Sequence, residues 1–285
     1  MCYTQNRFKA LLSACVLSLI ATAGWSQSIT WLGVLPDGVY SYAYAVSADG
    51  AVVVGWARNA AGQWRAFRWT ASGGMQDLGT LGGSESVAYG VSADGAVVVG
   101  SAENAAGRGR AFRWTASGGM QDLGTLGGRE SEAWGVSADG AVVVGYARNA
   151  AGQWRAFRWT AAGGMQDLGT LPGYDRSFAL DVSADGVVVV GVADNAAGQR
   201  RAFRWTAAGG MEDLNTTYAS LLTNGSVLIE ARAISPDGRY IVGSGYNAAT
   251  GRYEAFLLDT VPEPASLLAL GAGLAGLVGL RRRKR

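Results

Sequence analysis

Few side chains in this sequence could support catalysis or bind a metal. The chain has no histidine, and its two cysteines, Cys2 and Cys15, both lie near the N-terminus. The rest of the chain therefore cannot hold a cysteine–histidine zinc site, a disulfide, or a nucleophile activated by a histidine base. These absences exclude many classes of enzyme.

Carboxylates remain as candidate acids, bases and ligands. Glu103, Glu130 and Glu132 could supply the carboxylate pair of a glycoside hydrolase, but nothing in their spacing sets their separation. Calcium loops bring several oxygen ligands together, whereas each Asp-Gly turn of this chain offers one carboxylate. We assign no catalytic residue, metal ligand or cofactor. The turn aspartates are interpreted as turn formers: Asp49, Asp94, Asp139, Asp185 and Asp237.

Six aromatic residues are better candidates for a binding site. Three positions of an internal repeat carry them in its first and third copies, whereas the other copies have at most one aromatic residue there. Exposed aromatic rings can stack on the apolar faces of sugars. Packing across strands on a sheet surface is the alternative. The six are Tyr44, Trp56, Trp64, Trp134, Tyr146 and Trp154.

The repeat that must position these residues reads VSADG-AVVVG, a short loop, AFRWT, and GGMQDLGTLGG. Its copies are spaced 45, 45, 46 and 52 residues apart, and they begin at Val46, Val91, Val136, Val182 and, as a divergent ISPDG, Ile234. Such a period is typical of propeller blades or stacked arrays, because one unit cannot bury its apolar face alone.

Each copy predicts four short antiparallel strands. Asp49-Gly50 is a strong hairpin signal, Asn59 to Gly62 forms a second turn, and Gly73-Gly74 forms a third. Asn59 and its counterparts are predicted to be left-handed turn residues. The tryptophan of each AFRWT segment is predicted to pack in the core or between blades (Trp69, Trp114, Trp159 and Trp205). We therefore predict an all-β fold, a β-propeller of five four-stranded blades over residues 27–260.

Residues 28–38 resemble the last segment of a repeat, because Leu32, Gly33 and Leu35 match the Leu-Gly-x-Leu pattern of residues 78–81. The fifth copy lacks that segment after Thr260. We expect the N-terminal strand to complete the fifth blade and close the ring. The alternative is an open β-repeat array.

An arginine and an aspartate recur on either side of the third turn, first as Arg68 and Asp77. A cross-strand ion pair is the expected reason. In the fifth copy the two positions are Leu257 and, if the N-terminal segment contributes, Trp31, so both charges would be lost together. The other pairs are Arg113/Asp122, Arg158/Asp167 and Arg204/Asp213.

The repeat region is acidic although the whole chain has a net charge of +2. Arg7, Lys9 and the five basic residues of the C-terminal tail lie outside it. Between residues 27 and 260 the chain has 17 basic and 21 acidic residues, a net charge of −4. An acidic body argues against a nucleic-acid partner.

Residues 1–26 are predicted to be a secretory signal peptide. Basic residues precede an apolar run from Leu11 to Ile20, and Ala21-Thr22-Ala23 gives a cleavage site. A lipoprotein signal ending at Cys15 is the alternative, but the apolar run continues beyond this cysteine. Export through the secretion machinery is expected.

Residues 261–285 differ in composition from the repeats. Pro262-Glu263-Pro264 precedes an apolar run from Ala265 to Leu280. This run predicts a single short transmembrane helix, although it is below the usual length of about 20 residues. The chain ends in basic residues that would stay in the cytoplasm: Arg281, Arg282, Arg283, Lys284 and Arg285.

These C-terminal features together resemble the PEP-CTERM sorting signal of Gram-negative bacteria. The resemblance implies recognition by an exosortase, a membrane protease-transpeptidase, with Pro262-Glu263-Pro264 as the processing motif. It also implies export across the inner membrane, transient anchoring, and then a cell-surface or extracellular location. Carriers of this signal often accompany exopolysaccharide and biofilm genes.

The body, over about residues 31–259, resembles the HAF-type extracellular repeat family. The shared segments are AFRWT, GGMQDLGTLGG and SADGAVVVG, but Arg65 and its counterparts replace the histidine implied by the family name. This resemblance supplies no catalytic residue. We expect an exported, non-enzymatic propeller that acts in surface or biofilm-matrix interactions, with exopolysaccharide as a candidate ligand. The alternative is a polysaccharide-acting enzyme on the same scaffold.

Overall fold

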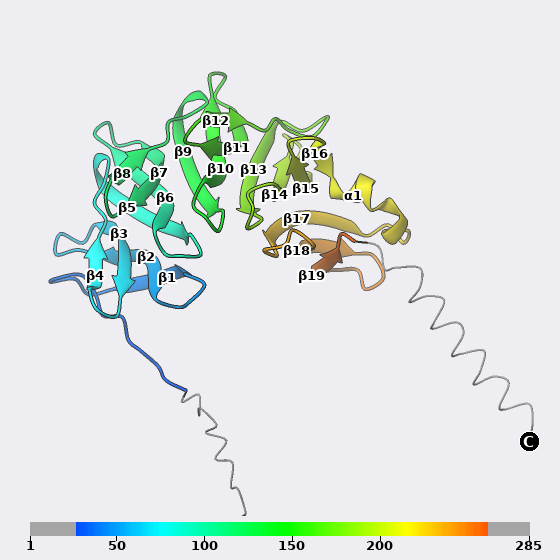
Figure 1. Cartoon of the computed structure of the whole chain (residues 1–285). Helices are drawn as coiled ribbons and strands as arrows, with labels where there is room; N and C mark the ends of the chain where they lie inside the picture. Colours follow the sequence, from blue (N-terminus) through cyan, green and yellow to red (C-terminus); the bar gives the residue numbers. More distant parts are fainter. Residues whose placement is uncertain (1–26, 262–285) are drawn as a thin grey trace, which may run out of the picture. The chain divides into compact units, whose positions relative to one another are not determined.

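The computed structural model describes residues 27–261, which form five antiparallel β-sheets (Figure 1). Sheets 1 to 4 have four strands each, and sheet 5 has three. Each sheet contains the VSADG or ISPDG turn of one copy, the strand that leads into it and the strands that follow it, and the predicted all-β class is confirmed. Residues 32–261 contain all five sheets, whereas residues 27–31 carry no helix or strand.

The strands follow the chain order. Sheet 1 contains β1 (Ser41–Val46), β2 (Val52–Arg58), β3 (Trp64–Thr70) and β4 (Gly74–Asp77). Sheet 2 contains β5 (Gly82–Val91), β6 (Val97–Asn104), β7 (Gly109–Thr115) and β8 (Gly119–Asp122). Sheet 3 contains β9 (Gly127–Val136), β10 (Val142–Asn149), β11 (Trp154–Thr160) and β12 (Gly164–Asp167).

Sheet 4 contains β13 (Arg176–Val182), β14 (Val189–Asp194), β15 (Arg200–Thr206) and β16 (Gly210–Asp213). Sheet 5 contains β17 (Val227–Ile234), β18 (Tyr240–Asn247) and β19 (Arg252–Asp259). Between them lie the short helix α1 (Leu214–Thr217) and the 3-10 turn η1 (Ala219–Leu221). Asn215 bridges this insertion to sheet 5, because its amide exchanges hydrogen bonds with the Leu228 backbone at 2.7 and 2.9 Å.

The turn residues act much as predicted. The Ser47 hydroxyl donates to Asp49 Oδ1 at 2.6 Å, and the Ala51 N–H donates to the same oxygen. The interpretation of the aspartates as turn formers is therefore confirmed. The expectation for Asn59 was wrong: Gly62 has the positive φ of 75°, whereas the Asn59 side chain accepts hydrogen bonds from the next turn residues.

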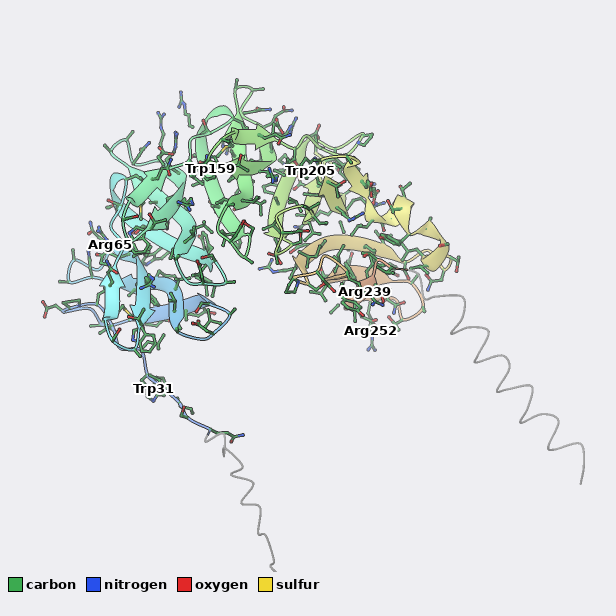
Figure 2. All side chains as sticks on the ribbon, viewed as in Figure 1. Trp31, Arg65, Trp159, Trp205, Arg239 and Arg252 are labelled. Atoms are coloured by element: carbon green, nitrogen blue, oxygen red, sulfur yellow. The ribbon has the colours of Figure 1, made fainter. Side chains whose placement is uncertain are left out.

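The hydrophobic core lies between consecutive sheets. Val52 and Val54 of sheet 1 pack against Val98, Phe112 and Trp114 of sheet 2. The same arrangement recurs at the three following interfaces. Trp114, Trp159 and Trp205 are buried at these interfaces, as the sequence predicts, whereas Trp69 of sheet 1 is only half-buried (Figure 2 labels Trp159 and Trp205). Each sheet is thus stabilised by its neighbours.

A buried serine provides a polar bond across three of these interfaces. The Ser86 hydroxyl accepts from the Ala66 N–H at 2.9 Å and donates to the Gly79 carbonyl at 2.6 Å. Ser131 and Ser177 make the same pair of bonds in later copies. Each serine satisfies two backbone groups that would otherwise be buried without partners.

The predicted pair of Arg68 and Asp77 was wrong. Arg68 lies opposite Gln76 and Phe67 lies opposite Asp77, so the side chains of Arg68 and Asp77 are on opposite faces of the sheet. Arg65 is the partner of Asp77, with Nε 3.1 Å from Oδ2.

Arg68 instead donates to the Gly95 carbonyl of sheet 2 at 3.2 Å. In sheet 2, likewise, Asp122 pairs with Arg110. In sheet 4, Arg204 has Glu212 as its partner at 3.8 Å, rather than Asp213. The joint loss of charge at Leu257 and Trp31 therefore no longer supports ring closure, because Arg68 and Asp77 are not a pair.

The described residues show no closed sheet. In residues 27–261 sheet 5 has no fourth strand, so the expected completion by the N-terminal strand is not observed. Leu35 is buried against Ala57 and Phe67 of sheet 1. Ser41 donates to the Gly33 carbonyl at 2.8 Å, as Ser86 does to Gly79. The segment around Gly33 therefore does follow the repeat pattern.

The predicted signal peptide (1–26) and the predicted membrane helix with its basic tail lie outside the described residues. Within residues 27–261, no helix is long and apolar enough to cross a membrane.

Ser131→Ala should lower the free energy of unfolding by about 1–3 kcal/mol, because the Ala111 N–H would lose its acceptor inside an interface. Ser41→Ala is the matched control, since the Ser41 hydroxyl bonds only to the Gly33 carbonyl at the surface. Urea denaturation of both variants would measure the difference. Equal losses would contradict a stabilising role for the buried serine bridge.

Candidate ligand-binding surface

Sheet 1 gathers five aromatic side chains into one group. Tyr40 and Tyr42 lie two residues apart along the chain into β1. Tyr44 lies at the β-bulge between Ala43 and Ala45, and its ring centroid is 5.0 Å from that of Tyr42. Trp56 on β2 lies opposite Tyr42 in the register, with ring centroids 6.3 Å apart. The Trp56 ring also lies 5.3 Å from Tyr40 and 5.3 Å from Trp64. These contacts form one continuous group.

The aromatic contacts continue into sheets 2 and 3. Tyr44 lies 5.4 Å from Tyr89 of β5, measured between ring centroids. Tyr89 then stacks on Trp134 of β9, at 4.6 Å and an interplanar angle of 4°. These rings come from the same position of three successive copies, so the repeat itself brings them together.

The contacts end at the boundary of sheets 3 and 4. Trp134 lies 6.2 Å from Tyr146 on β10, and Tyr146 lies 5.3 Å from Trp154 on β11. Phe178 of β13 meets Tyr146 edge-on at 4.9 Å. We call the whole set the aromatic belt: Tyr40, Tyr42, Tyr44, Trp56, Trp64, Tyr89, Trp134, Tyr146, Trp154 and Phe178.

All six aromatic residues chosen from the sequence therefore belong to one connected surface. The sequence analysis did not select Tyr40, Tyr42, Tyr89 or Phe178 as candidates. The alternation Tyr-x-Tyr-x-Tyr at residues 40–44 was the available signal for the first two. No signal within its own strand identifies Phe178, because its partners come from the preceding sheet.

Exposure divides the belt into two parts. Tyr40, Tyr42 and Tyr44 are about half exposed, and Trp64 is 41% exposed. Tyr146 and Trp154 are half-buried and wedged against sheet 4. The packing alternative thus describes the sheet 3 part, whereas the sheet 1 part presents ring surface to solvent.

Polar groups occupy the sheet 3 part of the belt. The Tyr146 hydroxyl donates to Glu132 Oε2 at 2.8 Å. Burial raises the pKa of Tyr146 above its ordinary value of 10, and the charge of Glu132 raises it further. The Arg148 guanidinium stacks on Trp154 at 4.4 Å, and its Nε donates to Glu130 at 2.7 Å.

The carboxylates considered for glycoside hydrolysis are each engaged by a different partner. Glu130 pairs with Arg148, and Glu132 accepts from Tyr146. Glu103 accepts from the Ser84 hydroxyl at 2.7 Å, and this bond lowers its pKa. No free acid–base pair is assembled by these three residues.

A cleft of 440 Å³ adjoins the belt where sheets 3 and 4 meet. Its walls include Arg148, Trp154 and Arg176, and Arg176 pairs with Asp194 at 2.6 Å. Both of its arginines are therefore engaged in ion pairs, and Asp175, also in its wall, accepts from the Ala196 N–H at 2.9 Å. Among residues 27–261, no group of three or more histidine, cysteine, aspartate or glutamate side chains is placed to hold a metal ion.

Asp181 is a buried carboxylate that the sequence analysis did not single out. Sheets 2 and 3 have Gly90 and Gly135 at its position. The Asp181 carboxylate accepts from the Val182 N–H at 2.8 Å and from the Ile234 N–H of sheet 5 at 2.9 Å. Burial raises its pKa, although both hydrogen bonds oppose this shift. Asp181 thus joins sheet 4 to sheet 5.

Comparison with known proteins identifies one motif and a fold. Residues 260–284 match the PEP-CTERM protein-sorting motif. This motif implies an exported protein that is recognised by an exosortase and passes through a membrane-anchored stage. The matched residues are a small part of the chain, and the match does not extend to the repeats. Comparison with curated proteins finds no match.

Two solved structures share the fold of the repeats. A putative TolB from Agrobacterium tumefaciens is 17% identical, with a TM-score of 0.53 and 78% of each chain covered. TolB from Acinetobacter baumannii is 14% identical, with a TM-score of 0.55, and the match covers 78% of this chain and 52% of that one. These likenesses support blades of the β-propeller type. At such low identity they show the fold alone.

Asp181→Asn should remove one component of the pH dependence of stability. In the folded protein the pKa of Asp181 is raised above its ordinary value of 3.8. The protonated carboxyl therefore contributes to the free energy of unfolding fully below pH 3.8, and this contribution is lost as the pH rises through the folded pKa. The parent should therefore lose more stability than the variant over this window. Urea denaturation at a series of pH values would measure the difference, and parallel curves would contradict it.

Proposed function

We propose that this protein is an exported, non-enzymatic β-propeller-type protein that binds a carbohydrate polymer at the sheet 1 part of the aromatic belt. One observation carries the proposal: several neighbouring rings there are in mutual contact and are also about half exposed. The C-terminal sorting motif is consistent with it, because export brings the chain to where extracellular polymers occur.

Carbohydrate suits this surface better than a purely apolar partner. Each exposed tyrosine combines an apolar ring with a hydroxyl that can donate and accept hydrogen bonds, as sugar faces and edges require. Successive rings about 5–6 Å apart offer a row of stacking positions rather than one closed pocket. The net charge of −4 over residues 27–260 favours a neutral polymer over a strongly anionic one.

The biological setting that we propose is the cell surface or biofilm matrix. Exopolysaccharide made by the producing cell is the first ligand to test, because proteins with a C-terminal signal of this kind often accompany exopolysaccharide genes. The HAF-type resemblance of the repeats agrees with an extracellular role. The enzymatic alternative has less support, because the three carboxylates considered for it are held by other side chains.

Trp64→Ala and Tyr42→Ala should each weaken polysaccharide binding roughly tenfold, or about 1.4 kcal/mol, because each removes one stacking ring. Affinity electrophoresis against neutral and acidic polysaccharides would measure the change. Trp31→Ala is the control, since Trp31 is exposed but lies outside the belt. Absence of binding to every polymer tested, or an equal loss in the control, would contradict the proposal.

The sorting motif makes a separate prediction. In cells with an exosortase, the protein should lose the residues that follow Pro262-Glu263-Pro264, and a Pro262→Ala, Pro264→Ala variant should keep them. Intact-mass measurement of protein from the medium and membranes would distinguish the two forms. A parent protein found only in membranes and still carrying Arg281–Arg285 would identify a plain membrane anchor instead.

A further inference from the structure

Within residues 27–261, the first and last sheets, sheet 1 and sheet 5, each have an apolar face that no other sheet covers. We call the side of a sheet that packs on the next sheet its leading face, as with Val52 and Val54 of sheet 1. The side that packs on the preceding sheet is its trailing face, as with Val98 and Trp114 of sheet 2. Four interfaces join leading to trailing faces, so the leading face of sheet 5 and the trailing face of sheet 1 remain.

The leading face of sheet 5 keeps the apolar character of a buried interface. Val242 is 41% exposed, although the valines at its position in the other sheets are fully buried (Val54, Val99, Val144 and Val190). Tyr240 occupies the position of Val52 and is also exposed. Leu257 is exposed where sheets 1 to 3 carry an arginine that donates to a carbonyl of the next sheet.

The trailing face of sheet 1 shows the complementary pattern. Val53 and Trp69 are only half-buried, whereas their counterparts Val98 and Trp114 are at most 6% exposed. Val46 is 58% exposed. This face therefore has the valines and tryptophan of an interface without the sheet that covers them.

The turn at Gly50 shows the same missing neighbour. A Cβ atom on Gly95 would lie 2.4 Å from a methyl group of Val52, because the turn of sheet 2 sits on sheet 1. A Cβ atom on Gly50 would meet nothing within 4 Å. The counterpart of Val52 that would fill this space is Tyr240.

Both end faces differ from those of a typical soluble repeat array, whose terminal repeats carry a polar outer side. The polar bonds of the internal interfaces are also partly absent. At each interface the N–H of the residue before the turn aspartate donates to the carbonyl of its counterpart in the next sheet, as Ala48 does to Ala93. Pro236 of sheet 5 accepts from the Ala184 N–H in this way, but it has no N–H to donate to a further sheet. Leu257 cannot replace the hydrogen bond that Arg68 makes to Gly95. Apolar contact would dominate any partner interface.

We propose that the leading face of sheet 5 docks on the trailing face of sheet 1 in a second copy of this chain. The two faces are complementary because they are the two halves of the interface that occurs four times within the chain. Ser41, already bonded to Gly33, has the position of Ser86 and would accept from Ala255, the counterpart of Ala66. Such head-to-tail contacts give a ring or an open chain of copies.

The test uses two variants that each block one end. Val46→Glu places a charge on the trailing face of sheet 1, and Val242→Glu places one on the leading face of sheet 5. Both valines are exposed, so each variant should fold. Sedimentation velocity on the protein recovered from producing cells should show concentration-dependent oligomers for the parent and monomers for each variant, with at least a tenfold weaker association.

Mixing the two variants gives the decisive measurement. Each retains the face that the other lacks, so an equimolar mixture should form dimers and nothing larger. Val187→Glu is the control, because Val187 is an exposed valine outside both end faces and its variant should associate like the parent. A monomeric parent, or a mixture without dimers, would overturn the proposal.

A third result would also overturn it. If the parent is monomeric and both end variants lose thermal stability together, the two faces contact each other within one chain. Polysaccharide binding by the belt is measured separately and involves neither Val46 nor Val242. Failure of the assembly proposal and failure of the binding proposal are therefore distinguishable.

Discussion

Burial of a layer of valine, phenylalanine and tryptophan between consecutive sheets is the interaction on which this structure depends. A single four-stranded sheet of this sequence has two apolar faces and cannot cover either one, so each copy folds against its neighbours. The short turns then follow from the need for the strands to return within one copy. Even the arginine of AFRWT stabilises this interface in the first three copies, because Arg68, Arg113 and Arg158 each donate to a carbonyl of the next sheet.

The period of the repeat and the Asp-Gly turns were enough to predict the sheets, because both are local in sequence. Register across the third turn was not predictable in the same way. Arg68 and Asp77 flank that turn, and a shift of one residue moves a side chain to the other face of the sheet. The observed pairing of Phe67 with Asp77 places Arg65, rather than Arg68, beside the aspartate.

Variation between copies identified six members of the aromatic belt. Residues needed for the fold are the same in every copy, whereas positions that differ between copies can serve another role, such as binding. The division of the belt into exposed and packed parts could not be predicted. Whether a ring such as Trp154 is free depends on what the next sheet places beside it, and Phe178 does so. Trp64 has no such aromatic neighbour from sheet 2, whose equivalent of Phe178 is Val87.

Carbohydrate binding and head-to-tail assembly rest on different residues, but assembly would change how strongly the protein binds a polymer. One exposed row of rings gives a weak site, because each stacked sugar contributes little on its own. Head-to-tail copies would present that row repeatedly along one assembly, and a long polymer could engage several rows at once. The second contact then occurs at the high effective concentration set by the first, so overall binding strengthens without any new residue. A protein that assembles through its apolar end faces is thus suited to multivalent binding of a polymer with repeating units.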